Sequence, residues 1–457
     1  MKKQDPSFAE ATSLLILIIA CIAYSVIIVQ MPATVAILFV LAILTAYVAL
    51  RYRSFDKIHR GIVEGIKPGI IPIIIFILVG ALIAVWIQAG IIPTLMVYGF
   101  HILRAEWFVP TVFLVCAIVG SAVGSAFTIM STIGIAFFGI GLTMGIYPPL
   151  VVGAIVSGAV FGDKMSPLSE STNLAAAVVE ADLFEHIKNL MWSTVPAFVV
   201  SLILYAVFGH SDATANLETI TQTSAQLKAS FFVSPLALIP ILVMFLCAWK
   251  KIPAIATIFI NILLGLVMSS LEMKRVPLKE FAQIIDQGFV AKTSDEQINA
   301  LLSRGGISSM LPTIALIILA LSLGGILIET KIISTVLDRL IPKLNSTFSL
   351  IFSTLLASIG VNIFIGEQFL SVILPGNAFK DIYRQKQLAP VVLSRTLEDG
   401  GTVINYLIPW GIAGSFVAST FGIPVLTFAP FVFFSLLSPL FSIVSGITGI
   451  GVKKSQI

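Results

Sequence analysis

The sequence predicts an all-helical, polytopic membrane protein with about 11–13 transmembrane helices in two inverted-topology repeats that contain broken or re-entrant helices. Three observations lead to this prediction. Hydrophobic residues make up 58% of the 457-residue chain and charged residues only 11%. Apolar stretches of about 20 residues, long enough to cross a bilayer, recur along the chain. The two halves share matching residues in the same order, whereas their equivalent loops differ in charge.

The composition excludes several classes of protein. A soluble domain carries about a quarter charged residues, so we expect the lipid bilayer to solvate much of this chain. The net charge is only +4, and no basic patch with interleaved aromatic residues indicates a nucleic-acid partner. We find no P-loop, HExxH or GxSxG motif, and therefore expect no nucleotide, no cofactor and no enzymatic activity. The separated cysteines Cys21, Cys116 and Cys247 are interpreted as small buried hydrophobic residues.

The predicted spans follow the apolar segments in order. The first lies behind Lys2 and Lys3 and is too long for a signal peptide, so we expect it to be retained. The spans are 11–30, 33–51, 69–90, 107–121, 129–146, 148–162, 188–208, 232–249, 252–271, 307–328, 347–365, 388–408 and 425–448. Six further stretches are too short, too polar or too often broken by Gly and Pro to be plain spans, and several of them are expected to be half-helices or re-entrant segments: 91–104, 122–128, 163–185, 331–345, 366–386 and 409–424.

Two features indicate an inverted repeat. Pro72 matches Pro312 and Gly120 matches Gly360 at an offset of 240 residues, and Pro167 and Pro409 continue at 242. The loop 51–67 holds five Lys or Arg against two acidic residues, whereas its counterpart 272–306 holds five of each. The positive-inside rule places the first loop in the cytoplasm and allows the second to lie outside.

This orientation divides the chain into segments. We expect a multi-pass protein of the cell membrane with both termini in the cytoplasm. The expected segments are a cytoplasmic N-terminus at 1–10, a first repeat at 11–208, an external linker at 209–230, a second repeat at 231–450 and a cytoplasmic C-terminus at 451–457.

Three polar clusters interrupt the apolar sequence, at 162–173, 360–368 and 394–402. A charge at bilayer depth is costly and persists where it has a partner or a function. Carboxylate, hydroxyl and amide oxygens are the ligands that a hard cation such as Na⁺ prefers. A carboxylate that binds either Na⁺ or H⁺ releases one on binding the other, so alternating access would produce cation/proton antiport. The first candidate for this carboxylate is Asp163, followed by Glu367 and Asp399.

Structural alternatives stand beside these assignments. Lys164 could neutralise Asp163 permanently, and Arg395 could form an ion pair with Glu398 one helical turn away. Glu170 could complement a helix dipole, and the segment 171–173 could cap the helix that follows. The small residues of 120–125 are explained by close helix packing without any ligand.

The motifs FGDKMSPLSESTNLA at 161–175, GEQFLSVILPG at 366–376 and LSRTLEDGGTV at 393–403 resemble those of the NhaC family of bacterial Na⁺/H⁺ antiporters. This resemblance covers nearly the whole chain. It implies an elevator-like transporter that exchanges Na⁺, or Li⁺, for H⁺, with these small cations as its partners; a homodimer is left open. It also implies a set of cation- and proton-binding residues. They are Asp163, Ser166, Thr172, Asn173, Glu367, Glu398, Asp399 and Thr402, to which the polar sequence around the second and third clusters adds Asn362 and Asn405. The candidate Na⁺ ligands are Asp163, Thr172, Asn173, Glu367 and Asp399.

One departure from the family pattern leaves the choice of ion open. Hydroxyl residues expected after Thr402 and after Trp410 are missing here, and Asn405 is the nearest substitute. The nearest alternative is an exchanger of a dicarboxylate and protons for lactate and Na⁺, for which Lys164 and Arg395 are the candidate anion-binding residues. Both have acidic neighbours in the sequence, which favours exchange of inorganic cations. An ion channel is a more distant alternative.

Overall fold

The computed structural model describes residues 5–53, 55–102, 105–209, 217–250, 252–272, 277–340, 344 and 346–455. The regular structure of these residues is helical, apart from one isolated bridge between Leu388 and Lys454. The ends of the predicted terminal segments, 1–4 and 456–457, and residues 210–216 of the predicted linker lie outside the described residues.

The first part of the chain forms eleven α-helices joined by short turns. They are α1 (Phe8–Ala23), α2 (Ala33–Tyr52), α3 (Asp56–Ile66), α4 (Ile70–Gln88), α5 (Ile91–Ile102), α6 (Phe108–Val123), α7 (Ala126–Ile129), α8 (Ile135–Thr143), α9 (Pro148–Met165), α10 (Glu170–Val178) and α11 (Leu183–Phe208).

The second part begins with a helix in the predicted linker and continues to the C-terminus. Its helices are α12 (Leu217–Ser230), α13 (Ile239–Trp249), α14 (Ala254–Glu272), α15 (Leu278–Gln287), α16 (Glu296–Leu302), α17 (Ile307–Glu329), α18 (Ile332–Leu340), α19 (Thr347–Ile365), α20 (Gln368–Gln385), α21 (Pro390–Gly401), α22 (Ile412–Phe421), α23 (Val425–Phe428) and α24 (Phe433–Thr448).

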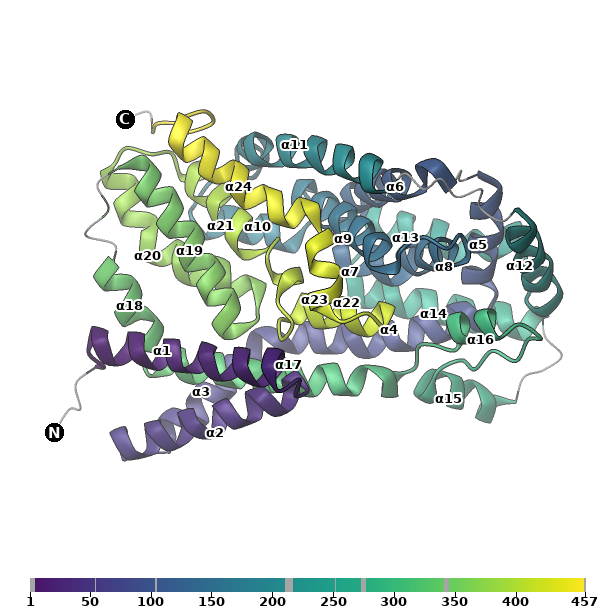
Figure 1. The fold of residues 1–457 in the computed structure, drawn as a ribbon, viewed down its shortest axis with the longest axis horizontal. Coiled ribbons are helices and arrows are strands. Elements are labelled where there is room, and N and C mark those ends of the chain that lie inside the picture. The colour runs from purple at the N-terminus through teal and green to yellow at the C-terminus, as the bar shows by residue number, and fades with distance from the viewer. Residues whose placement is uncertain are drawn as a thin grey trace.

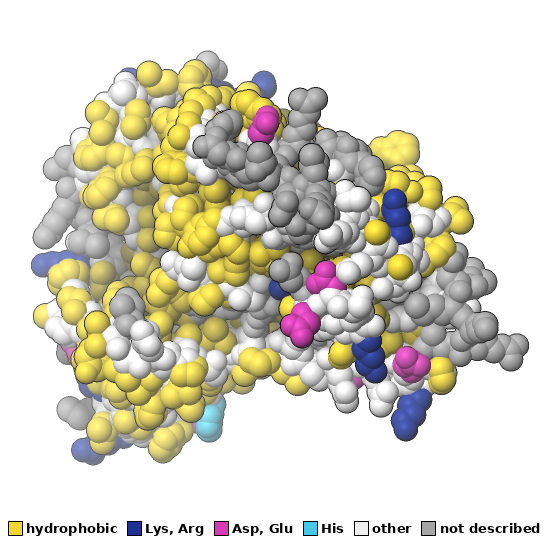
Figure 2. All heavy atoms as spheres, turned by 45° about the vertical axis from the view of Figure 1, so that its right-hand side comes forward, with side chains coloured by type: hydrophobic (Ala, Val, Ile, Leu, Met, Phe, Trp, Pro, Cys, Tyr) yellow, Lys and Arg dark blue, Asp and Glu magenta, His cyan; other side chains and the backbone are white. Residues whose placement is uncertain are grey.

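The helices confirm a polytopic membrane protein. Among the described residues eight helices are long and apolar enough to cross a bilayer, or eleven if each of three bent pairs counts as one span. Hydrophobic side chains cover most of the described surface in Figure 2, and charged side chains are few on this face. On α11, for example, Trp192, Val199, Ile203 and Val207 are exposed. Such a surface is solvated by lipid tails rather than by water.

Several predicted boundaries were wrong. The span placed at 69–90 matches α4 within two residues, but the segment before it is not a loop, because a 3-10 turn at Lys67–Gly69 joins α4 to the helix α3. By contrast, the segment 366–386 was expected to be too polar for a plain span, and its 18-residue helix α20 is not among the candidate spans of the described residues. The span placed at 388–408 is α-helical only as far as Gly401, because the chain then turns through Asn405. The long loop 272–306 contains the two helices α15 and α16.

The helices form two groups, seen one above the other in Figure 1, where α1–α4 and α14–α17 lie below and α6–α11 and α19–α24 lie above. Both chain ends lie at one end of the molecule, and α15 and α16 lie at the other. The helices α4 and α17 run in opposite directions. The amide of Gly306, before α17, donates to Gly80 late in α4 at 2.7 Å, whereas Gly325 late in α17 packs on Gly65 in α3.

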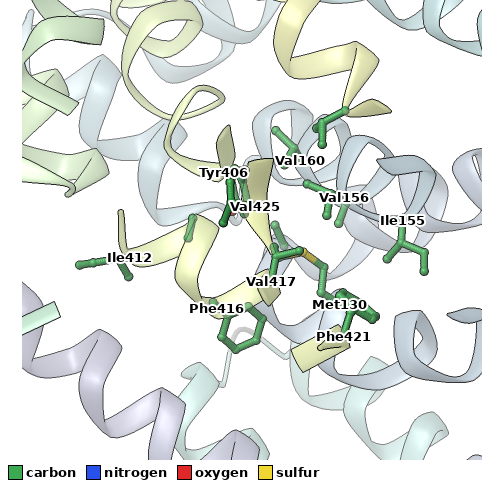
Figure 3. Close-up of a cluster of buried hydrophobic side chains, with 14 of the residues drawn as sticks. Met130, Ile155, Val156, Val160, Tyr406, Ile412, Phe416, Val417, Phe421 and Val425 are labelled. Atoms are coloured by element: carbon green, nitrogen blue, oxygen red, sulfur yellow. The ribbon is translucent and has the colours of Figure 1, made fainter. Parts of the chain in front are cut away.

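Apolar packing holds the broken helices together in the upper group. Figure 3 shows side chains of α9, of the segment around Met130 and of α22 gathered in one cluster. The helices α6 and α9 approach closely at two glycines, because a Cβ atom added to Gly162 would lie 2.5 Å from the Cα atom of Gly120. The expectation that small residues here allow helix packing is therefore confirmed for Gly120.

Candidate cation-binding site

Two helical hairpins turn back inside the upper group with the same local geometry. After α6, Gly124 adopts a φ of +70°, and the Ser125 hydroxyl accepts a hydrogen bond from the Thr128 amide. After α19, Gly366 adopts a φ of +73°, and the Glu367 carboxylate accepts one from the Leu370 amide at 2.7 Å. Glycine is required at both turns because other residues are strained at positive φ. The two hairpin tips are 242 positions apart in the sequence.

Two crossing helices are broken near these tips. The helix α9 ends at Met165, and α10 begins at Glu170 with a bend of 47°. Ser169 caps α10 through the Thr172 amide. The helix α21 ends at Gly401, and the side chain of Asn405 accepts a hydrogen bond from the Ala413 amide at the start of α22, at 2.8 Å. The proposal that residues 171–173 are the cap is therefore wrong, since they lie within α10.

A cavity of about 470 Å³ lies between the α9–α10 break, the two hairpin tips and helices that include α4 and α14. Its only charged lining residues, within the described chain, are Asp163 and Glu170. Polar lining is added by residues of the first hairpin tip, of α10 and of α20. The polar members are Ser125, Thr128, Ser171, Asn173 and Gln368, with Thr257 from α14, and the apolar members include Phe76, Phe127, Met244 and Phe369.

Asp163 is the carboxylate that faces this cavity. It lies in the last turn of α9 and is partly exposed. Its Oδ2 atom is 3.5 Å from the hydroxyl of Ser171, and the hydroxyl of Thr172 donates to the carbonyl of Lys164 at 3.1 Å. The amide of Asn173 is directed back to the carbonyls of Pro167 and Ser169. Ser166 is buried, and its hydroxyl accepts a hydrogen bond from the Leu168 amide in the break. The predicted residues of the first cluster therefore do lie together.

Lys164 does not neutralise Asp163. Its ammonium group is fully buried and forms an ion pair with Asp399 on α21. The same group donates to the hydroxyl of Ser438 on α24 at 2.8 Å, and that hydroxyl donates to Asp399 at 2.5 Å. The alternative of a fixed Asp163–Lys164 pair is therefore wrong, because the two side chains point to different elements.

The other acidic candidates, Glu367, Glu398 and Asp399, are buried. Glu398 accepts a hydrogen bond from the Thr402 hydroxyl at 2.5 Å and interacts electrostatically with Asp163. The expected Arg395–Glu398 ion pair is wrong. Arg395 instead donates to Ser445 at 2.7 Å and to the carbonyl of Gly451 at 3.1 Å.

Asn362 and Asn405 bond to each other rather than to the cavity. The amide of Asn405 donates to the side-chain oxygen of Asn362 at 2.6 Å, and the amide of Asn362 donates to the carbonyl of Gly401. Together they tie the end of α19 to the break after α21. Within the described residues Asp163, Glu367 and Asp399 do not gather into one metal-binding group.

Comparison with known proteins agrees with this architecture. The family model described as "Na+/H+ antiporter family" matches residues 158–450, which include both broken helices and the second hairpin. Over 91% of both chains, the sequence is 42% identical to the Na⁺/H⁺ antiporter NhaC of Alkalihalophilus pseudofirmus. This chain belongs to the Na⁺/H⁺ antiporter family.

Relatives that are named for different substrates match this chain over most of their length. The NhaC antiporter of Bacillus subtilis is 36% identical over 86% of this chain and 87% of its own. The arginine/ornithine antiporter ArcD of Halobacterium salinarum is 34% identical over 98% and 93%. The malate-2H⁺/Na⁺-lactate antiporter of B. subtilis is 34% identical over 87% and 85%. Membership of the Na⁺/H⁺ antiporter family therefore has to be combined with the site itself to identify the substrate.

Sequence reasoning missed the contribution of α24. Its buried serines Ser435, Ser438, Ser442 and Ser445 are 3, 4 and 3 residues apart and so lie on one face of the helix. That spacing on an otherwise apolar span is a signal that was available in the sequence. Glu170 was interpreted only as a dipole-compensating residue, but it also lines the cavity.

Proposed function

We propose that this protein exchanges Na⁺ for H⁺ across the cell membrane by alternating access, and that Asp163 binds the two ions in turn. The observation that carries this proposal is the charge of the cavity. Asp163 and Glu170 line it, and the described lining residues include no lysine, arginine or histidine. A cavity with this lining attracts a cation and repels an anion.

Competition at one carboxylate is sufficient for exchange. The oxygen atoms of Asp163, with the hydroxyls of Ser171 and Thr128 and the amide of Asn173 in the same wall, are the ligand types that a hard cation prefers. A bound Na⁺ and a proton cannot share the same carboxylate oxygens. Each ion therefore displaces the other whenever the cavity opens to a new side.

The rival reaction with organic anions is disfavoured by the position of the two buried cationic side chains. Lys164 is held by Asp399 and Ser438, and Arg395 by Ser445 and Gly451. Neither lines the cavity. A dicarboxylate in this cavity would face Asp163 without a positive side chain to balance its charge.

We also propose that segments 11–208 and 231–450 are inverted repeats joined by the linker 209–230, with both termini in the cytoplasm. The matched hairpin tips at Gly124 and Gly366 and the opposite directions of α4 and α17 support this arrangement. Elevator-like movement of the upper helices against the lower ones would then expose the cavity to each side.

The purified protein reconstituted in liposomes tests the function. We expect an imposed pH gradient to collapse on addition of Na⁺ or Li⁺, but not of choline. Vesicles that ignore Na⁺ and Li⁺ but respond to malate with lactate, or to arginine with ornithine, would overturn the proposal.

A further inference from the structure

Asp399, Glu398 and Ser438 form a buried oxygen-rich position beside the cavity, and it is bound by a side chain of the protein itself. Asp399 and Glu398 are consecutive on α21 and fully buried, and Ser438 faces them from α24. The group that contacts Asp399 and Ser438 is the ammonium of Lys164. An ammonium group carries the same single positive charge as Na⁺.

We propose that Lys164 occupies a second monovalent-cation position in this protein and thereby confines ion exchange to Asp163. This inference rests on the proposed Na⁺/H⁺ exchange and deepens it, because it identifies the residue that sets the number of exchangeable cations. Without the Lys164 charge, Asp399 would become a second Na⁺ site.

Unpartnered oxygen atoms support this reading. Oδ2 of Asp399 and Oε1 of Glu398 are buried and have no hydrogen-bond partner in the described structure. The hydroxyls of Ser435 and Ser442, on the same face of α24 as Ser438, are likewise buried and unpartnered. Buried polar atoms without partners are costly, so these oxygens are available to bind a cation or water.

Charge balance gives the second argument. The charged side chains that face this position are Asp163 and Lys164 from α9 and Arg395, Glu398 and Asp399 from α21. His186 of α11 lies nearby and bonds to Ser394 at 2.7 Å. Three carboxylates therefore face two cationic groups. Removing the Lys164 charge leaves Asp399 without its ion-pair partner in a buried place, where a small cation can compensate the negative charge.

The chain order supplies the route. Asp163 borders the cavity and Lys164 follows it directly, so the backbone of one helical turn connects the cavity wall to the Lys164–Asp399 ion pair. Shortening the Lys164 side chain to an uncharged one opens space beside Asp399. Lys164→Gln is therefore the informative variant, and Lys164→Gln with Asp399→Asn is its matched control without the carboxylate.

The test measures ²²Na⁺ bound at saturation by the full-length protein in detergent. We expect about one Na⁺ per chain for the wild type, about two for Lys164→Gln and about one for the double variant. One site in Lys164→Gln, in a folded protein, would overturn the proposal. A wild type that binds no Na⁺ would instead overturn the proposed function.

Folding of the single variant provides a second measurement. We expect Lys164→Gln to be stabilised by NaCl relative to choline chloride in thermal unfolding, and more strongly than the double variant. Stabilisation by Na⁺ that is equal in the two variants contradicts the inference. So does a single variant that stays unfolded in saturating NaCl while the double variant folds, because Asp399 would then accept no Na⁺.

Discussion

Asp163 and Lys164 are consecutive residues of α9 whose side chains enter different surroundings: the carboxylate of Asp163 faces a cavity, and the ammonium of Lys164 is buried against Asp399. Adjacent side chains on a helix point about 100° apart, so one turn of helix can serve two purposes. The pair separates an exchangeable carboxylate from a fixed ion pair. The predictions below test the two purposes and the packing that supports them.

Removing the charge of Asp163 should abolish transport without unfolding the protein. We expect Asp163→Asn to reduce Na⁺-driven proton flux in liposomes by about a hundredfold or more, because neither ion then has a carboxylate to bind. Glu170→Gln is the matched control, since Glu170 lines the same cavity but is exposed at the start of α10. It should reduce the flux far less than Asp163→Asn does, because Glu170 adds to the negative charge of the cavity but is not the proposed exchanging group. Transport by Asp163→Asn at the wild-type rate would exclude Asp163 as the exchanging group.

The apparent affinity for Na⁺ should depend on pH with a definite sign. As pH falls, protons occupy Asp163 and must leave before Na⁺ binds, so the apparent Kd for Na⁺ should rise by up to about tenfold per pH unit. Above the pH at which Asp163 is ionised, the Kd should become constant. Equilibrium binding of ²²Na⁺ from pH 6 to pH 9 measures this. A Kd that is constant through the whole range speaks against competition at one site.

The contact between α6 and α9 should tolerate no side chain at Gly162. A Cβ atom there would lie 2.5 Å from Gly120, so we expect Gly162→Ala to destabilise the protein by about 1–3 kcal/mol. Gly360→Ala is the control, because nothing lies within 4 Å of a Cβ atom at Gly360. Thermal unfolding in detergent compares the two variants. Equal melting temperatures would show that α6 and α9 can separate without cost.

The Asn362–Asn405 pair should matter for stability more than for ion binding. Asn405→Ala leaves the side-chain oxygen of Asn362 and the backbone amide of Ala413 without partners, at a cost of about 1–3 kcal/mol. Asn261→Ala should cost less, since the Asn261 side chain bonds only to the carbonyl of Thr257 in its own helix. We expect the Kd for Na⁺ of folded Asn405→Ala to stay near the wild-type value. A large rise in Kd would assign Asn405 to the ion site.

Opposite loops should be accessible from opposite sides of the membrane. In a variant without native cysteines, we expect His59→Cys to react with an impermeant maleimide only from the cytoplasmic side and Ser294→Cys only from the outside. Both positions are exposed, so burial does not bias the comparison. Labelling of both positions from one side would contradict the inverted repeat.

The helices and the polar clusters could be predicted because each depends on local sequence. Long apolar runs form helices in lipid since no other solvent satisfies their backbone groups. The segment 163–185 was expected to be broken, and α9 does end at Met165 beside Pro167. The full length of α20 could not be predicted in the same way. Its polar residues, among them Asn377, Lys380 and Asp381, do not exclude a helix whose neighbours supply contacts, as Lys380 does with Glu180 at 2.7 Å.

The partners of the charged residues were predicted less well. Glu398 follows Arg395 by three positions, a spacing typical of a helical ion pair, yet Arg395 bonds to Ser445 and Gly451. Lys164 follows Asp163 directly, yet it bonds to Asp399, which is 235 positions away. The spacing of residues along one helix predicts only ion pairs within that helix. The packing of α21 against α24 and α9 places partners from other helices closer to these side chains.

The sequence by itself determined that this chain is a membrane protein, that the helix before Pro167 breaks and which carboxylates are costly to bury, because hydropathy and the cost of buried charge act residue by residue. Only the tertiary structure decided that Asp163 faces a cavity, that Asp399 forms an ion pair with Lys164 and that Asn362 forms a hydrogen bond with Asn405. Those assignments depend on which helices cross and at what rotation, and both are set by packing between segments that are distant in the chain.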